Sequence, residues 1–146
     1  FVGKHTLMTT STRVPLMIRV PGMAKGVSKS MVELVDIYPT ICDLCGIDAP
    51  VQQLDGKSLT PILRNPSRSV KREVYVQWQG GDNLQDNRFN YAEWPKSGNA
   101  MLFDHKTDRD ENVNVSGKSD YASTVNRMSK DMKKVKKFAF RKKWGK

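Results

Sequence analysis

Hydrophobic residues in the first third of the chain occur in short blocks bounded by glycine, proline and polar residues. Residues 14–20 are rich in β-branched and large apolar side chains, with Pro15 near the entrance and Pro21 and Gly22 at the exit. This composition and these boundaries predict a β-strand. A second short strand is expected at residues 31–35, after a linker of mainly small and polar residues.

Two helical segments are expected after these strands. Asp36 fits the N-cap of a helix that tolerates Pro39 in its first turn and ends at Gly46. Ser58 can cap a brief helical turn that ends at Leu63. Both strand and helix signals therefore occur up to about residue 64, and we interpret this region as α/β.

The pattern changes after residue 73 to short β-prone runs, at residues 74–78, 88–94 and 100–104. Residues 80–83 and 95–99 contain the glycine, asparagine and proline residues that favour turns. Short strands that alternate with turns predict a small antiparallel sheet.

A helix is expected to follow this sheet. Apolar residues recur at helical spacing, at Tyr121, Val125, Met128, Met132 and Val135. Ser119 or Asp120 can cap the helix at its start. The stripe forms one apolar face, which we interpret as the face that packs on the small sheet rather than as a cofactor site.

These patterns divide the chain into three regions: residues 1–64, residues 65–137 and a basic tail at residues 138–146. The polar stretch 64–72 reads as the linker between the first two. Only 38% of the 146 residues are hydrophobic, and the mean hydropathy is −0.59. Such a composition is typical of a part of a protein that packs against a larger partner. No apolar run approaches the ~20 residues of a membrane helix.

The net charge of +10 is concentrated near the end of the chain. Residues 133–146 contain eight basic residues and no acid, so residues 1–132 carry only +2. Phe138, Phe140 and Trp144 are interleaved with the cations, a pattern that can bind a polyanion by charge and stacking. The pattern alone predicts a polyanion as the ligand, and a solvated terminus is the alternative. The candidate residues are Lys133, Lys134, Lys136, Lys137, Arg141, Lys142 and Lys143.

A series of motifs, in a fixed order, resembles the sulfatase family. The motif near the start comprises K-H-T-L at residues 4–7 and S-T-R-V-P-L-M-I-R-V-P-G at residues 11–22, which are similar to the segment after the second group of metal ligands in that family. The later motifs lie at residues 32–40, 43–47, 54–59, 88–94 and 102–108, with Glu111 and Asn112 following. The likeness extends over about residues 3–135 and is greatest to sulfatases of the iduronate-2-sulfatase type.

The resemblance implies the C-terminal part of an alkaline-phosphatase-like α/β fold, followed by a small antiparallel sheet with a packed C-terminal helix. It also implies a formylglycine nucleophile and a calcium ion in the complete enzyme. The formylglycine arises from a C/S-x-P-x-R sequence, which this chain lacks. Residues 66–68 (P-S-R) imitate the end of that sequence, but Arg64 stands where the cysteine would be. We expect neither metal ligands here nor turnover by this chain alone.

Among the family's catalytic positions, the resemblance maps Lys4 onto this chain. In the family this lysine contacts the sulfate, so Lys4 is the expected catalytic and substrate-binding residue. His5 is adjacent and is a second candidate for substrate contact, with a partly exposed loop histidine as the alternative. The chain departs from the family at residues 8–10 (M-T-T), where an aromatic residue and one or two acids are common.

Other chemically reactive residues have simpler interpretations. Cys42 and Cys45 form a C-x-x-C pair. A zinc ion would need two more ligands, and a redox pair would lie at the N-terminus of a helix, whereas this pair lies in the last turns of one. Buried free thiols are therefore favoured. His105 is expected at the surface at a strand end. The nearby acids Asp104, Asp108, Asp110 and Glu111 are expected in a solvated turn, because their spacing matches no EF-hand.

Two functions follow as hypotheses. One is the C-terminal part of a sulfatase that acts on a sulfated carbohydrate together with the N-terminal portion of the same enzyme. The other is a non-catalytic basic module that binds sulfated polysaccharide or another polyanion, with nucleic acid less favoured than a sulfated polysaccharide. By resemblance the enzyme is secreted, periplasmic or lysosomal, and Asn114 begins an N-x-S glycosylation sequon.

Overall fold

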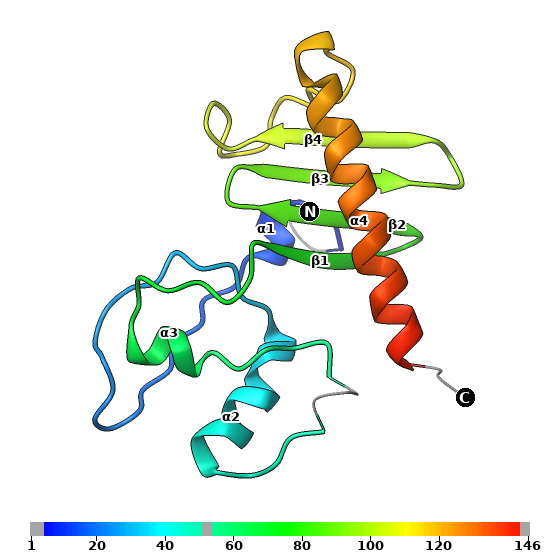
Figure 1. Ribbon diagram of the computed structural model, residues 1–146. Coiled ribbons are helices and arrows are strands. Elements are labelled where there is room, and N and C mark those ends of the chain that lie inside the picture. The colour runs from blue at the N-terminus through cyan, green and yellow to red at the C-terminus, as the bar shows by residue number, and fades with distance from the viewer. Residues whose placement is uncertain (1–4, 51–53, 144–146) are drawn as a thin grey trace. The chain divides into compact units, whose positions relative to one another are not determined.

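The computed structural model describes residues 5–50 and 54–143, with only the backbone for residues 137–143 (Figure 1). The chain divides into two compact units. One unit combines the described residues up to Pro15 with Tyr75–Lys137, and the other combines Leu16–Val74 with the end of the chain. The predicted domain boundaries at residues 64 and 137 remain predictions.

The first unit is built on a four-stranded sheet. Its strands are β1 (Glu73–Trp78), β2 (Gly81–Asp86), β3 (Phe89–Trp94) and β4 (Asn99–Asp104). They lie in the order β1-β2-β3-β4, and the pairs β2–β3 and β3–β4 are antiparallel (Figure 1). The sheet is therefore a meander, whose neighbouring strands are joined by short turns.

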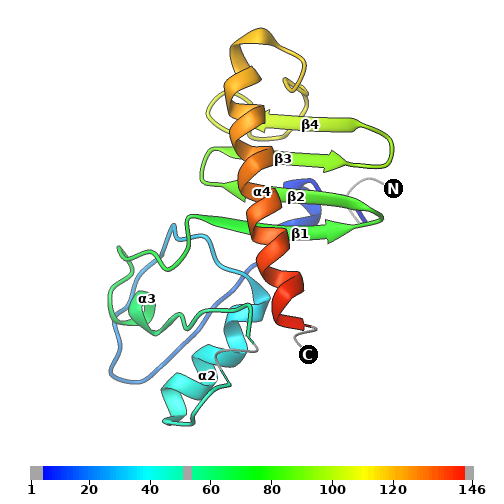
Figure 2. The same ribbon diagram turned by 45° about the vertical axis from the view of Figure 1, so that its right-hand side comes forward.

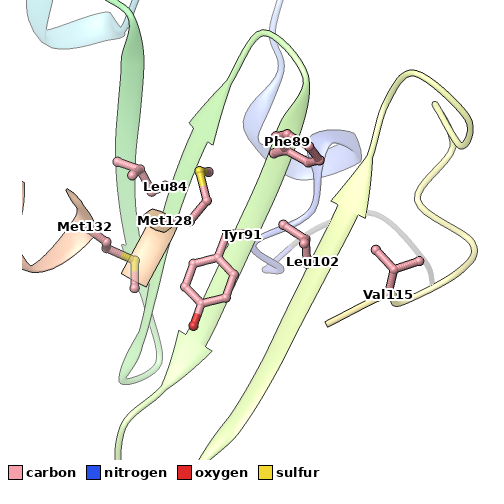
Figure 3. Packing of buried hydrophobic residues seen from close by; sticks show 7 residues of the cluster. All are labelled: Leu84, Phe89, Tyr91, Leu102, Val115, Met128 and Met132. Carbon is pink, nitrogen blue, oxygen red and sulfur yellow. The ribbon is translucent and has the colours of Figure 1, made fainter. Parts of the chain in front are cut away.

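Helix α4 (Ala122–Lys143) runs across one face of this sheet (Figure 2). Met128 and Met132, one helical turn apart, are 0% and 1% exposed and face the core. The core cluster also contains residues from β2, β3, β4 and the following loop, shown in Figure 3: Leu84, Phe89, Tyr91, Leu102 and Val115. Tyr121, Val125 and Val135 pack against this cluster. The predicted apolar stripe and its role are confirmed.

Strand β2 corrects the sequence-based prediction, which assigned residues 80–83 to a turn. The turn is instead formed by Gln79 and Gly80, whose φ angles are +46° and +73°. Two successive residues with positive φ are typical of the two-residue turns that match the twist of a hairpin. The sequence of β2, G-D-N-L-Q-D, shows no apolar alternation because Leu84 alone supplies a large apolar side chain to the core.

The second unit contains the short helices η1 (Leu34–Asp36), α2 (Ile37–Cys45) and α3 (Thr60–Arg64). Helix α2 ends, as predicted, at Gly46, whose φ of +65° gives the left-handed cap that favours glycine. Helix α3 begins at Thr60, whose backbone N–H donates a 3.2 Å hydrogen bond to Ser58 Oγ. No described helix is both long and apolar enough to cross a bilayer.

Asp36 occupies the N-cap position of α2, as predicted, but its side chain makes no cap hydrogen bond to that helix. Its carboxylate, which is fully buried, accepts 2.8 Å hydrogen bonds from the backbone N–H groups of Glu33 and Lys57. It also forms a 2.7 Å ion pair with Lys71. Asp36 therefore joins three segments of this unit.

The prediction of strands at residues 14–20 and 31–35 is wrong. Residues 13–20 have no regular secondary structure, and residues 34–36 form η1 instead of the end of a strand. Val14 and Met17 are 53% and 93% exposed. A strand needs a neighbour to accept its hydrogen bonds, and these residues have none among the strands that the structure describes.

Candidate functional site

The face of the sheet opposite α4 is polar. Because side chains alternate along a strand, Asn83 and Gln85 of β2 point away from the face that Leu84 shares with the core. The register places Gln85 opposite Asn90 and Asn83 opposite Ala92 on the neighbouring strand. We call the surface formed by Asn83, Gln85 and Asn90 the polar face.

Residues 5–12 lie on this polar face and include the short helix α1 (Thr9–Thr12). Leu7 is 2% exposed, and its carbonyl oxygen accepts a 3.3 Å hydrogen bond from Asn90 Nδ2. Gln85 Nε2 lies 3.3 Å from Thr9 Oγ1, to which it donates. The segment that follows Lys4 in the chain is thus anchored to the sheet.

Glu111 is the centre of this anchorage. Its carboxylate accepts hydrogen bonds from the Thr9 backbone N–H (2.7 Å), the Thr9 hydroxyl (2.5 Å) and Asn90 Nδ2 (2.7 Å). His105 Nε2 lies 2.7 Å from Glu111 Oε1. Glu111 is only 4% exposed and has a φ of +57°, a conformation that a non-glycine residue adopts only when its surroundings hold it there.

The charge state of Glu111 follows from these contacts. Burial by itself raises the pKa of the carboxyl group, because it disfavours the charged form. The hydrogen bonds from Thr9, Asn90 and His105 favour the charged form, and together they outweigh burial, so the pKa lies below its ordinary value. Glu111 is therefore a carboxylate that holds three segments of the chain together.

The prediction of a solvated acidic turn is wrong for two of its four residues. Asp104 and Glu111 are 2% and 4% exposed, whereas Asp108 is partly exposed and Asp110 is exposed. Asp104 accepts two hydrogen bonds from the Arg88 guanidinium, at 2.9 and 2.7 Å. These bonds lower the pKa of Asp104 to about 2, against the opposing effect of burial. Among the described residues no group of three or more potential metal ligands occurs.

His105 is likewise not the surface residue that was expected. Its side chain is 17% exposed and pairs with Glu111. The reason is that β4 ends at Asp104 and the following turn returns the chain under the polar face, where the buried carboxylate needs donors.

Of the two predicted substrate-contacting residues, Lys4 lies outside the described residues. His5 is described and exposed, with a φ of +63°. Its imidazole stacks on the indole of Trp78, with ring centroids 5.1 Å apart and an interplanar angle of 29°. Sequence reasoning missed Trp78, Asn90 and the role of Glu111, since each acts through residues distant in the chain.

The basic residues of α4 are only partly available for a ligand. Lys133 and Lys134 are exposed, but Lys134 Nζ donates a 2.9 Å hydrogen bond to Asp131. Lys136 Nζ lies 2.6 Å from Asp82 Oδ2, so it joins α4 to β2. The side chains of the remaining candidates, Lys137, Arg141, Lys142 and Lys143, lie outside the described part of the structure.

The predictions for the cysteines and the sequon have mixed outcomes. Cys42 is a buried free thiol, as expected, whereas Cys45 is free but exposed. Asn114 is exposed, and its Nδ2, the atom that would carry a glycan, donates a 3.1 Å hydrogen bond to the carbonyl of Ala100. Its Oδ1 accepts a 3.0 Å bond from Leu102 N, so this side chain supports β4.

Comparison with known proteins places these features in a family. The family model described as N-sulphoglucosamine sulphohydrolase, C-terminal, matches residues 1–138. N-acetylglucosamine-6-sulfatase of Homo sapiens is 41% identical over 88 residues, covering 58% of this chain and 16% of that protein. Arylsulfatase K of Xenopus laevis is 30% identical over 149 residues, covering 90% of this chain and 27% of that protein. The chain therefore spans less than a third of either relative.

A solved structure shows the same fold. The phosphonate monoester hydrolase from Silicibacter pomeroyi matches with a TM-score of 0.77 and 28% sequence identity. The match covers 90% of this chain and 30% of that chain. The predicted likeness to the C-terminal part of an alkaline-phosphatase-like fold, with a small antiparallel sheet and a packed helix, is confirmed.

Proposed function

Because this chain belongs to the family of C-terminal regions of N-sulphoglucosamine sulphohydrolase and related sulfatases, we propose that it is part of an enzyme that hydrolyses sulfate esters of a glycan. The match over residues 1–138 is the observation that carries the proposal. The name of the human relative describes action on a sulfated amino sugar, which supports a sulfated carbohydrate as the substrate class. Likeness to the iduronate-2-sulfatase type remains a narrower hypothesis.

In this proposal Lys4 contacts the sulfate group. A fixed ammonium group there neutralises charge on the sulfate oxygens and on the bridging oxygen as the S–O bond breaks. Such stabilisation needs a charge that is held in place before the reaction. The anchorage of Leu7 and Thr9 on the polar face supports this role, because it restrains the segment that begins directly after Lys4.

The formylglycine and the calcium ion that the family implies are assigned to the remaining polypeptide of the enzyme. The described residues present no group of potential metal ligands that fits such an ion.

The partner of this chain would be the N-terminal portion of the same enzyme. Large apolar side chains that remain exposed support this proposal, since extended apolar surface is typical of an interface. They include Val14, Met17, Val27, Tyr38, Ile41 and Ile47, each at least 53% exposed. By analogy with the family, the enzyme would act in a lysosome, in a periplasm or outside the cell.

The test uses the complete enzyme that contains this chain, with N-acetylglucosamine 6-sulfate as the substrate. Lys4→Ala should lower kcat for sulfate release by about 100-fold or more, in the range found for loss of one group that stabilises transition-state charge. Lys25→Ala, which removes an exposed lysine, is the matched control and should leave kcat unchanged. Full activity of Lys4→Ala would remove Lys4 from the mechanism.

The basic helix favours a second candidate function, the binding of sulfated polysaccharide or another polyanion. The exposed Lys133 and Lys134 lie on α4, one turn before the region that holds the other basic candidates. The double variant Lys133→Ala/Lys134→Ala should leave a heparin column at lower salt than the wild type. Lys25→Ala/Lys29→Ala carries the same change in net charge, and equal elution of both double variants would contradict a site on α4.

A further inference from the structure

His5 is held in a conformation that its own backbone disfavours. Its φ of +63° lies in the left-handed region, which non-glycine residues seldom occupy. Residues in such conformations persist when their surroundings determine them, and they concentrate at functional sites. The contact that the structure gives to the His5 side chain is the stack on Trp78, with centroids 5.1 Å apart.

Trp78 provides a rigid base for this contact. It is the last residue of β1, and the two residues that follow, Gln79 and Gly80, form the tight turn into β2. A side chain at the end of a strand next to a two-residue turn has little backbone freedom. Trp78 is 39% exposed and His5 is exposed, so neither ring is buried by the contact between them.

The rest of the segment formed by residues 5–12 is fixed as well. Thr6 Oγ1 and Ser11 Oγ form a 2.9 Å hydrogen bond, Leu7 is buried, and Thr9 binds Glu111. His5 therefore lies between Trp78 and a segment anchored on the polar face. Its imidazole has a set orientation at the position directly after Lys4.

A stacked imidazole–indole pair offers an apolar ring surface together with ring nitrogens that form hydrogen bonds. A sugar ring has the complementary chemistry, with apolar C–H groups on its faces and hydroxyl groups at its edge. We propose that the His5–Trp78 pair binds the sugar ring that carries the sulfate ester, and that Trp78 is a specificity-determining residue. This inference rests on the proposed sulfatase function and on the role of Lys4 as the contact to the sulfate group.

The experiment compares a ligand that has a ring with one that has none. In the complete enzyme, Trp78→Ala should raise KM for N-acetylglucosamine 6-sulfate about tenfold, the scale of losing one ring-stacking contact. Inorganic sulfate, measured as an inhibitor, carries no ring, so its inhibition constant should change less than twofold. Trp78→Phe keeps a ring face and should retain most of the affinity for the sugar sulfate.

Trp94→Phe is the matched control for loss of an indole from the same sheet. The Trp94 indole lies close to Gly81 and Leu7, outside the His5–Trp78 pair, so this variant should change the two constants by the same factor. If Trp78→Ala proves unstable, Trp78→Leu retains an apolar side chain without a ring and takes its place in the comparison.

Two results would overturn the inference while the sulfatase function stands. Parallel weakening of sugar sulfate and inorganic sulfate by Trp78→Ala would mean that Trp78 only maintains the segment around Lys4. Unchanged constants for both would mean that Trp78 contacts neither ligand. A wild-type enzyme that releases sulfate from no ester would instead overturn the proposed function, and with it this inference.

Discussion

The backbone N–H of Thr9 donates a 2.7 Å hydrogen bond to the carboxylate of Glu111, a residue 102 positions later in the chain. The Thr9 hydroxyl donates a second bond, of 2.5 Å, to the other oxygen of the same group. These two hydrogen bonds hold the segment that follows Lys4 against the polar face. The segment directly after Lys4 in the sequence is therefore fixed to the loop after β4.

Replacement of Glu111 by alanine should destabilise the protein by about 3–5 kcal/mol. The change removes the acceptor of a buried network and leaves the donors of Thr9, Asn90 and His105 without that partner. Unfolding in denaturant measures the loss. Asp110→Ala, at an exposed acid beside Glu111, should cost less than about 0.5 kcal/mol. Equal stability of the two variants would show that the network contributes little.

The ion pair between Arg88 and Asp104 should produce an acid-dependent loss of stability. Hydrogen bonds from Arg88 lower the pKa of Asp104 from its ordinary value of 3.8 to about 2 in the folded state. As the pH falls, Asp104 therefore takes up a proton at a higher pH in the unfolded chain than in the folded one. The ion pair consequently stabilises the folded state above the ordinary pKa. It is lost as the pH decreases from about 4 to about 2.

The measurement is Tm as a function of pH for the wild type and for Arg88→Met. The variant should start from a lower Tm at neutral pH and should lose less of it between about pH 4 and pH 2. A variant curve parallel to that of the wild type would contradict the assignment of this acid sensitivity to the pair.

Gly81→Ala should destabilise the sheet by about 1–3 kcal/mol, because β2 has no room for a methyl group at this position. A Cβ atom on Gly81 would lie 2.5 Å from Trp94 Nε1 and 2.8 Å from Leu7 Cδ1. A Cβ atom on Gly117 would have no other atom within 4 Å. Gly117→Ala is therefore the control, with an expected change in unfolding free energy close to zero. Thermal unfolding of both variants tests the difference, and equal Tm values would contradict the close packing at Gly81.

Met128→Ala should cost about 2–5 kcal/mol of unfolding free energy, since it opens a cavity between α4 and the sheet. Met128 is fully buried in the core cluster (Figure 3). Met17 is 93% exposed, so Met17→Ala should lie within about 0.5 kcal/mol of the wild type in this chain. Within the complete enzyme, a large effect of Met17→Ala would instead indicate that the partner portion covers it.

Local patterns in the sequence were sufficient for the elements that depend on their own neighbours. The stripe containing Met128 and Met132 predicted the helix and its buried face, and Gly46 marked the end of α2. Strands β1 and β3 carry enough β-branched and aromatic residues to be recognised, and β4 contains a short apolar run between turn residues. In these cases periodicity or turn chemistry acts over a few residues, so the information lies within the segment itself.

Tertiary structure decided the polar face. Strand β2 and the burial of Glu111 and His105 have no local signal, because polar side chains there are satisfied by partners from distant segments. Conversely, residues 14–20 have the composition of a strand but no neighbouring strand among the described residues. Periodicity in the amino-acid sequence thus determined which segments form the helix and the more apolar strands. Hydrogen bonds such as that between Thr9 and Glu111 depend on chain segments that meet only after folding, so the polar face could not be read from local sequence.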